Sequence, residues 1–280
     1  LLSARMDELM GAALPRSSRK LSLEQMEGLN LDSIAAFYQK LYTRPEGTTY
    51  VICGNFNPDS VMRQFVSVFG RIPASSSPSE YAYPPFELPT AKYVEGFPND
   101  NETQTLFDYL FFGHFEPGLK LMRDVIRSRL ISVLRERESL VYSPYISLVY
   151  DGIPWGIFYF DINASADNRN MPGIDVLLKD ILQKLQREEV DLEELQTIKR
   201  SFRIAKREAL NEEASATWRS TLVGLLKNGE SLADFERYEE CLDSITPAAL
   251  REAFERYLDI ENYVLLYLSK KQLNNDTKNN

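Results

Sequence analysis

The chain has 280 residues, of which 44% are hydrophobic, and a formal net charge of −9 at pH 7. This length gives room for one large domain or a domain and a half, and the composition is that of an ordinary folded protein. The acidic balance argues against nucleic acid as a partner, because phosphate backbones are bound by basic surfaces. No run of eighteen or more apolar residues occurs, so no membrane span is expected.

The first quarter of the chain predicts short helices and one strand. Residues 4–14 read as a helix, and Ser22 opens a capping box that starts a second, short one. A strand is expected at residues 48–53, and Pro58 at a first helical position opens a further helix. Between them lies a helix with an apolar face formed by Leu31, Ile34, Ala35, Tyr38 and Leu41.

The composition then changes over residues 73–90. This stretch follows Ile72 and is rich in serine and in proline, including Pro78, Pro84, Pro85 and Pro89. Proline restricts the backbone and favours semi-rigid connections. A linker, and with it a module boundary, is predicted here.

Beyond the linker the pattern alternates strands with long amphipathic helices. Strands are expected at residues 91–95, 104–112, 144–150, 155–164 and 262–268. Helices are expected at residues 116–136, 171–186, 191–226, 231–241 and 246–258. This pattern predicts an α+β fold in which a mostly antiparallel sheet packs in two layers against long helices. The polar tail at residues 271–280 is predicted to be disordered.

The corner at residues 134–145 is the stretch with the most functional interest. It reads Leu-Arg-Glu-Arg-Glu-Ser-Leu-Val-Tyr-Ser-Pro-Tyr, with Arg135 on the last turn of a helix and Tyr142 at the entry to a strand. An arginine there can simply complement the helix dipole. A tyrosine entering a strand can simply pack its ring and leave its hydroxyl in water. Alternatively, both side chains stand at the rim of a sheet, within reach of an extended ligand.

This corner resembles the Arg/Tyr segment of the insulinase/pitrilysin-type zinc metallopeptidases, whose metal motif is the inverted His-x-x-Glu-His. The resemblance implies that Arg135 and Tyr142 bind the substrate backbone and stabilise the tetrahedral intermediate. Tyr145 is a weaker alternative, because its spacing from Arg135 does not match. Many family members have glycine where this chain has Ser139. The run Gly54-Asn-Phe-Asn-Pro58 is also similar to a segment of the family.

The resemblance implies a domain organisation. Residues 1–72 would be the C-terminal part of a preceding peptidase-like module, and residues 91–270 a complete C-terminal one. Both would have the fold of the mitochondrial-processing-peptidase-like metallohydrolases. A weak internal similarity agrees, since a helix ending in Tyr42 before Thr-Tyr-Val-Ile reappears as a helix ending in Tyr257 before Asn-Tyr-Val-Leu. With no initiator methionine at Leu1, we expect a piece of a longer polypeptide.

The residues of a zinc site are missing from the sequence. His114 is the sole histidine, and no His-x-x-Glu-His occurs. A catalytic zinc needs several ligands, so His114 is interpreted as structural, and no cofactor is expected in this chain. The resemblance places the zinc in a missing upstream half. Cys53 and Cys241 suit neither a metal site nor a disulfide framework, and Glu136 and Glu138 are interpreted as solvated.

Three hypotheses follow. The first is the C-terminal, non-metal-binding part of a zinc metallopeptidase, which closes a peptide chamber and supplies Arg135 and Tyr142. The second is a non-catalytic structural or peptide-binding subunit of the same family. The third is an unrelated α+β binding domain. The expected partners are a peptide substrate and the zinc-bearing upstream half of the same polypeptide or a partner subunit, and the family suggests a bacterial periplasm or cell envelope.

Overall fold

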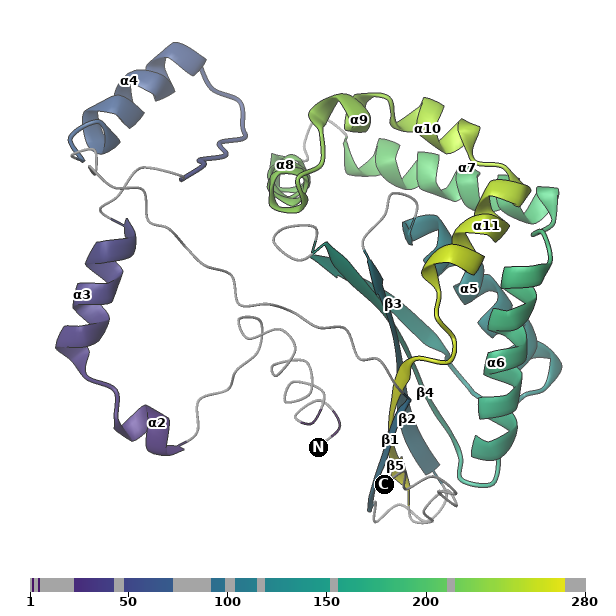
Figure 1. Ribbon diagram of the computed structural model, residues 1–280. Helices are drawn as coiled ribbons and strands as arrows, with labels where there is room; N and C mark the ends of the chain where they lie inside the picture. The colour runs from purple at the N-terminus through teal and green to yellow at the C-terminus, as the bar shows by residue number, and fades with distance from the viewer. Residues whose placement is uncertain are drawn as a thin grey trace.

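The sheet organises the larger part of the molecule (Figure 1). The computed structural model describes residues 2, 5, 23–42, 48–72, 92–98, 104–114, 119–151, 156–210 and 215–269. Its strands lie in the order β1-β5-β2-β4-β3. β1 pairs with β5 in parallel, and the other three pairings are antiparallel. The bounds are β1 Tyr93–Pro98, β2 Gln104–His114, β3 Tyr145–Asp151, β4 Ile157–Asp167 and β5 Tyr263–Ser269.

Helices cover one face of this sheet (Figure 1). Their bounds are α5 Leu119–Leu130, the π-helix η1 Ile131–Arg137, α6 Met171–Arg187, α7 Leu192–Ala209, α8 Ser215–Asn228, α9 Leu232–Glu236, α10 Tyr238–Ser244 and α11 Pro247–Tyr257. Local sequence sets several of their starts. Asp191 accepts hydrogen bonds from the backbone N–H groups of Glu193 and Glu194, and Thr246 caps α11 ahead of Pro247. The predicted two-layer α+β fold is confirmed.

Alternation along the strands separates two apolar surfaces. On β2, Phe107, Tyr109 and Phe111 belong to the large core between sheet and helices, whereas Leu110 and Phe112 form a smaller cluster on the opposite face. This is the period of two expected of a strand that is covered on both sides. Leu2 packs in the smaller cluster.

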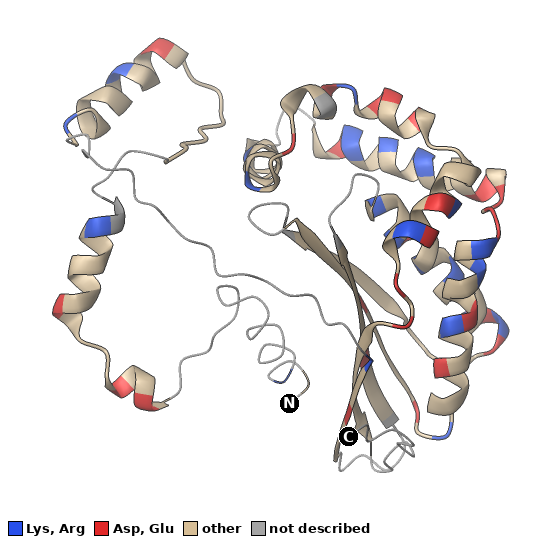
Figure 2. Ribbon diagram, in the orientation of Figure 1, with Lys and Arg blue, Asp and Glu red and all other residues tan. Residues whose placement is uncertain are grey.

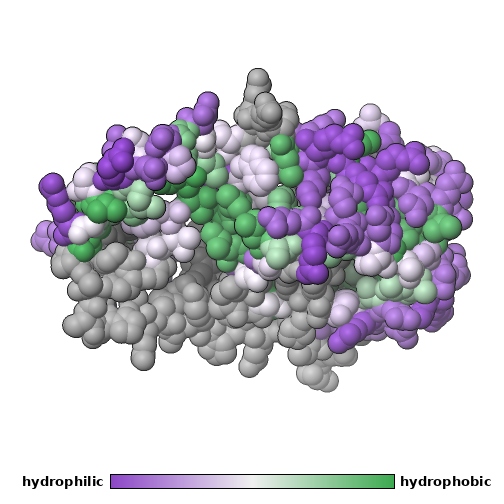
Figure 3. Space-filling view, turned by 90° about the horizontal axis from the view of Figure 1, so that it is seen from above, coloured by the Kyte–Doolittle hydropathy of each residue, from purple (hydrophilic) through white to green (hydrophobic). Residues whose placement is uncertain are grey.

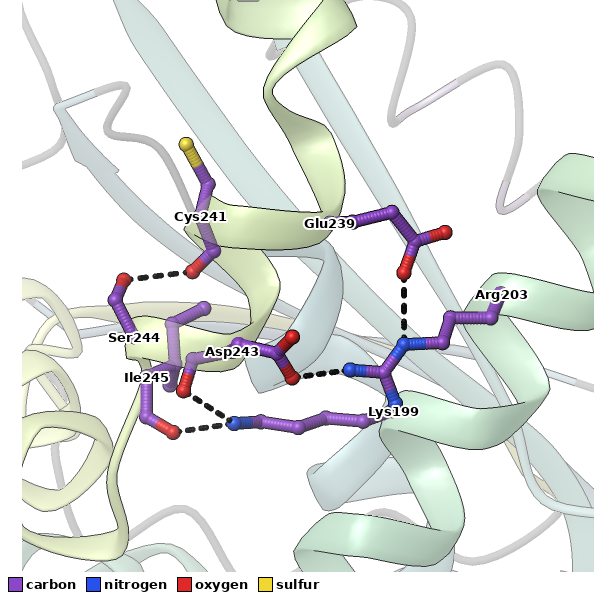
Figure 4. A network of polar contacts seen from close by, with 7 residues as sticks. All are labelled: Lys199, Arg203, Glu239, Cys241, Asp243, Ser244 and Ile245. Carbon is purple, nitrogen blue, oxygen red and sulfur yellow. Dashed lines mark hydrogen bonds and ion pairs between the residues drawn. The ribbon is translucent and has the colours of Figure 1, made fainter.

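Polar contacts hold the outer helices together (Figure 4). Lys199 of α7 is only 2% exposed, and its Nζ donates to the backbone carbonyl oxygens of Asp243 (3.3 Å) and Ile245 (2.5 Å) at the C-terminal end of α10. A cation there satisfies carbonyls that have no helical partner and complements the helix dipole. One turn later, Arg203 forms ion pairs with Glu239 and Asp243. Figure 2 shows that most charged residues lie on the helices and few on the strands.

Three helices precede the sheet: α2 Leu23–Glu27, α3 Leu31–Tyr42 and α4 Pro58–Phe69. In this segment Tyr50 packs edge-on against Phe65, with 4.9 Å between the ring centroids. No described residue of α2–α4 belongs to either core cluster of the sheet domain. Large apolar side chains are consequently exposed on all three helices, including Leu23, Met26, Leu31, Ile34, Phe37, Met62, Val66 and Val68.

Some predicted elements were wrong in detail. The strand at residues 48–53 is irregular in the structure, because its backbone finds no neighbouring strand among the described residues. The helix predicted at 191–226 is two helices, since α7 ends at Ala209 and α8 begins at Ser215. The helix predicted at 231–241 breaks at Arg237, between α9 and α10. The linker at 73–90, the tail at 271–280 and nearly all of the helix at 4–14 lie outside the described residues.

Candidate functional site

The predicted corner contains a π-helix. After α5, residues Ile131–Arg137 form the wider helix, and Glu138 N–H then donates to Val133 O (3.0 Å). Leu134 is 1% exposed, and its carbonyl oxygen accepts from the backbone N–H groups of Leu140 (2.8 Å) and Val141 (3.3 Å). These bonds fold the chain back on itself at the end of the helix. Buried Leu134 thus anchors the turn, while Arg135 beside it is exposed. Short π-helical segments often occur at functional sites.

Ser139 has a left-handed backbone conformation, with φ of +51°. The resemblance to the insulinase-type peptidases implies glycine here in many members, whereas this chain forms the turn with serine. A residue with a side chain costs roughly 1–2 kcal/mol in this conformation. Glycine would remove this strain, but its greater conformational entropy in the unfolded chain would offset part of the gain.

We therefore expect Ser139→Gly to raise the free energy of unfolding by about 0.5 kcal/mol. Urea denaturation followed by circular dichroism measures the change. The matched control is Ser143→Gly, four residues along the same loop at a position without positive φ. It should be neutral or destabilising. If both substitutions shifted stability in the same direction, strain at Ser139 would not be the cause.

Arg135 and Tyr142 meet at this corner. The guanidinium carbon of Arg135 lies 6.0 Å from the centroid of the Tyr142 ring, within cation–π range. Tyr142 is 83% exposed, which is unusual for a large aromatic residue. Both side chains line an open pocket of about 550 Å³. Tyr145 is exposed on β3 opposite Asn163 and does not line this pocket.

The other wall of the pocket was not predicted from the sequence. It is formed by Ser165, Ala166 and Asp167 at the end of β4, together with Arg169 and Asn170 in the turn that leads to α6. Val141 forms an isolated antiparallel bridge with Ala166, and the Asn170 amide donates to Leu140 O (3.4 Å). These contacts join segments 25 to 30 residues apart in the chain. The Asp-x-x-Asn turn is visible in the sequence, but nothing local assigns it to this corner.

The described residues contain no group of three or more His, Cys, Asp or Glu side chains that could hold a metal ion. His114 is the last residue of β2. Glu136 and Glu138 are exposed, as expected, and lie outside the pocket lining. Within the same part of the chain, no helix is both long enough and apolar enough to cross a membrane. The pocket therefore offers two guanidinium groups, a phenol, a carboxylate and backbone groups for binding.

The sheet layered on long helices agrees with the fold that the resemblance to the insulinase-type peptidases implies. The family model described as the peptidase M16 inactive domain matches residues 28–202, more than half of the chain. The chain belongs to this family, as an inactive C-terminal domain of the insulinase-like proteases. The resemblance drawn from the corner is confirmed at the level of the family. The inactive domain lacks the zinc-binding motif.

Solved structures show the same fold at low sequence identity. The periplasmic protease PqqL from Escherichia coli is similar with a TM-score of 0.77 and 17% identity, over 96% of this chain and 31% of that one. A peptidase M16 inactive domain from Pseudomonas fluorescens gives 0.71 and 16%, over 96% and 66%. A predicted insulinase family protease from Yersinia pestis gives 0.62 and 13%, over 92% and 58%.

The chain spans less than two thirds of the length of each of these three structures. A comparison with curated protein sequences finds no match.

Proposed function

We propose that this chain is the substrate-side part of a split-site zinc peptidase, in which it closes a peptide chamber over a metal centre carried by an upstream half. The observation that carries the proposal is the meeting of Arg135 with exposed Tyr142 at an open pocket. Membership of a peptidase family supports a peptide as the ligand of these two side chains.

The chemistry of the two groups suits acyl transfer. A guanidinium offers several N–H donors in a fixed plane, and a phenol offers one O–H donor. Both can hydrogen-bond a peptide carbonyl whose oxygen becomes negatively charged as the tetrahedral intermediate forms. In the proposed enzyme the zinc of the upstream half would supply the activated water. Arg135 and Tyr142 would bind the substrate backbone and stabilise the oxyanion.

The helices α2–α4 support the proposed domain organisation. Their exposed apolar side chains form the kind of surface that a globular protein normally covers. We propose that residues 1–72 are the C-terminal part of a preceding module, residues 73–90 the linker and residues 91–270 the inactive module. The upstream part of the preceding module would then cover these apolar faces.

A non-catalytic structural or peptide-binding subunit of the same family is the second candidate. It is supported by the match to a family model described as an inactive domain. A His-x-x-Glu-His motif in the upstream reading frame would favour the enzyme, and a frame without one would favour this candidate.

Two of the similar solved structures suggest a location and a kind of substrate. PqqL is described as a periplasmic protease, and FusC as a ferredoxin protease in complex with ferredoxin from Arabidopsis. By analogy we propose a bacterial periplasm or envelope location and a peptide or protein substrate. Fractionation of the native host with an antibody against the chain tests the location.

Reconstitution tests the proposed function. Residues 1–280 are assayed with zinc and a mixed peptide pool, alone and together with the upstream half of the parent polypeptide. We expect hydrolysis only in the mixture, and its loss on chelation of the metal. Tight association of the halves without hydrolysis would support the non-catalytic candidate instead. Zinc-dependent hydrolysis by residues 1–280 alone would contradict both.

A further inference from the structure

The turn between β4 and α6 is built to hold Arg169 at the pocket. Asn170 N–H donates to Asp167 O (2.9 Å), which closes a four-residue turn. The Asp167 carboxylate accepts from the backbone N–H of Arg169 (3.1 Å) through Oδ1. Such side-chain-to-backbone bonds favour a single turn conformation. The position of the Arg169 backbone is therefore fixed within the turn itself.

Buried hydroxyls fix this turn to the sheet. Asn168 Oδ1 accepts from Thr105 Oγ1 of β2 (2.5 Å) and from Ser269 Oγ of β5 (3.3 Å). Thr105 and Ser269 are both buried. The turn is thereby held to two further strands in addition to β4, which it follows. A site on a rigid support can orient its side chains more closely than one on a free loop.

The guanidinium of Arg169 forms an ion pair through one of its three nitrogens. Its Nε pairs with Asp167 Oδ2 at 3.1 Å, while the side chain is 84% exposed. This ion pair uses Nε, and the edge formed by the two terminal amino groups is one with which a guanidinium can bind a carboxylate in a bidentate manner. Arg135 lines the same pocket from the opposite wall. Two guanidinium groups and one carboxylate thus surround an open pocket in a protein of net charge −9.

We propose that Arg169 is a specificity-determining residue that binds a carboxylate of the peptide substrate in this pocket. Two sources share this chemistry: an aspartate or glutamate side chain within the peptide, and the free carboxylate at its C-terminus. The inference rests on the proposed function, because it assigns a preference to the peptide that Arg135 and Tyr142 would bind. Arg169 acts on selection of the substrate and not on the reacting bond.

Binding to the full-length parent protein tests this inference. Zinc is removed by chelation so that peptides are not cut, and fluorescein-labelled decapeptides are followed by anisotropy. Three probes share one neutral sequence: the amidated peptide, the amidated peptide with one central glutamate, and the peptide with a free C-terminal carboxylate. The variants are Arg169→Gln, Arg169→Lys and the control Arg187→Gln, which removes the same charge at the exposed C-terminal end of α6.

The expected result is a preference that depends on Arg169. The unaltered protein should bind one or both carboxylate-bearing probes about three- to tenfold more tightly than the neutral amide, in the range of a solvated charge-assisted contact. Arg169→Gln should abolish the preference and leave binding of the neutral probe within about twofold. Arg169→Lys should retain part of it, since lysine keeps the charge but not the planar fork. Arg187→Gln should retain all of it.

The probe that gains affinity identifies the source of the carboxylate. If the neutral probe binds but neither carboxylate probe gains, or if the gain survives Arg169→Gln, the inference is wrong while the proposed function stands. If no probe binds at all, including the neutral one, the proposed function itself fails.

Discussion

Replacing Arg135 with alanine in the complete, zinc-bearing protein is expected to lower kcat/KM for peptide hydrolysis by about a hundredfold or more. The loss follows from removing charge-assisted donors aimed at the developing oxyanion. Steady-state kinetics on a cleaved peptide measures it. The loss should appear mainly as a fall in kcat, because losing an interaction made only in the transition state lowers kcat and kcat/KM together.

The matched control is Arg137→Ala. Arg137 lies two residues further along η1, is 60% exposed and pairs with Glu138 outside the pocket lining. Its loss should leave kcat/KM within about twofold, in keeping with an exposed ion pair. Equal losses in the two variants would indicate general disruption of the π-helix. Full activity of Arg135→Ala would contradict the role proposed for this corner.

Tyr142→Phe divides the same effect further. It keeps the ring that faces the Arg135 guanidinium and removes only the phenolic hydroxyl. A loss in kcat would therefore report the O–H donor. Unchanged kinetics would leave the ring as a support for Arg135 and take Tyr142 out of oxyanion stabilisation.

A second large effect is expected from Asp108 of β2. Its side chain lies on the sheet face opposite the helices, where Leu110 and Phe112 also point. Burial raises the pKa of Asp108 to about 6, and the nearby carboxylate of Asp161 adds to the shift. Burial also raises the pKa of Asp161. Each carboxyl group would be easier to ionise in the unfolded chain, where water surrounds it.

The pH dependence of stability follows from this direction. Well below pH 4 both states hold the proton, and Asp108 contributes no difference. Between about pH 4 and 6 the unfolded chain ionises first, so stability falls as pH rises. Above about pH 6 Asp108 is ionised in both states, and the loss of stability has reached its full value. The shift corresponds to about 3 kcal/mol, which partial solvent access lowers to about 2 kcal/mol.

Asp108→Asn should therefore stabilise the protein by about 2 kcal/mol at pH 7.5 and have little effect at about pH 3. Urea unfolding of the two proteins at a series of pH values measures the difference. Asp180→Asn serves as the control, because Asp180 sits in an exposed i,i+4 ion pair with Lys184 on α6. A difference between Asp108→Asn and the unaltered protein that did not vary between pH 4 and pH 6 would contradict the raised pKa.

Regular elements were the part of this fold that the sequence could predict. All five strands beyond the linker lie within a few residues of their predicted places, whereas the helices predicted at 191–226 and 231–241 are each two helices in the structure. The wrong prediction at residues 48–53 has a physical reason. A β-branched and aromatic run favours a strand, but a strand also needs a partner to bond its backbone.

Only one of the two walls of the candidate site could be predicted from the sequence. Arg135 and Tyr142 lie close together in sequence, so their spacing and the family resemblance were sufficient to find them. The opposite wall with Arg169 depends on the bridge between Val141 and Ala166, which is a long-range contact. The π-helical form of residues 131–137 was also not predicted. Its hydrogen bonds depend on the burial of Leu134 and on the backbone of Ser139, neither of which a local pattern reveals.

The π-helix makes the number of residues before the turn matter as much as their identity. A π-helical turn contains one residue more than the corresponding α-helical turn. Each residue of an α-helix advances about 100° around the axis. Deleting one residue between Leu130 and Leu134 would return the segment to α-helical spacing. Leu130 and Leu134 are both buried, so the shorter segment could not keep both in the core, and any rotation of Leu134 would also turn its neighbour Arg135 away from its present direction. Homologous chains that keep the arginine outward should therefore tolerate substitutions in this segment far better than insertions or deletions.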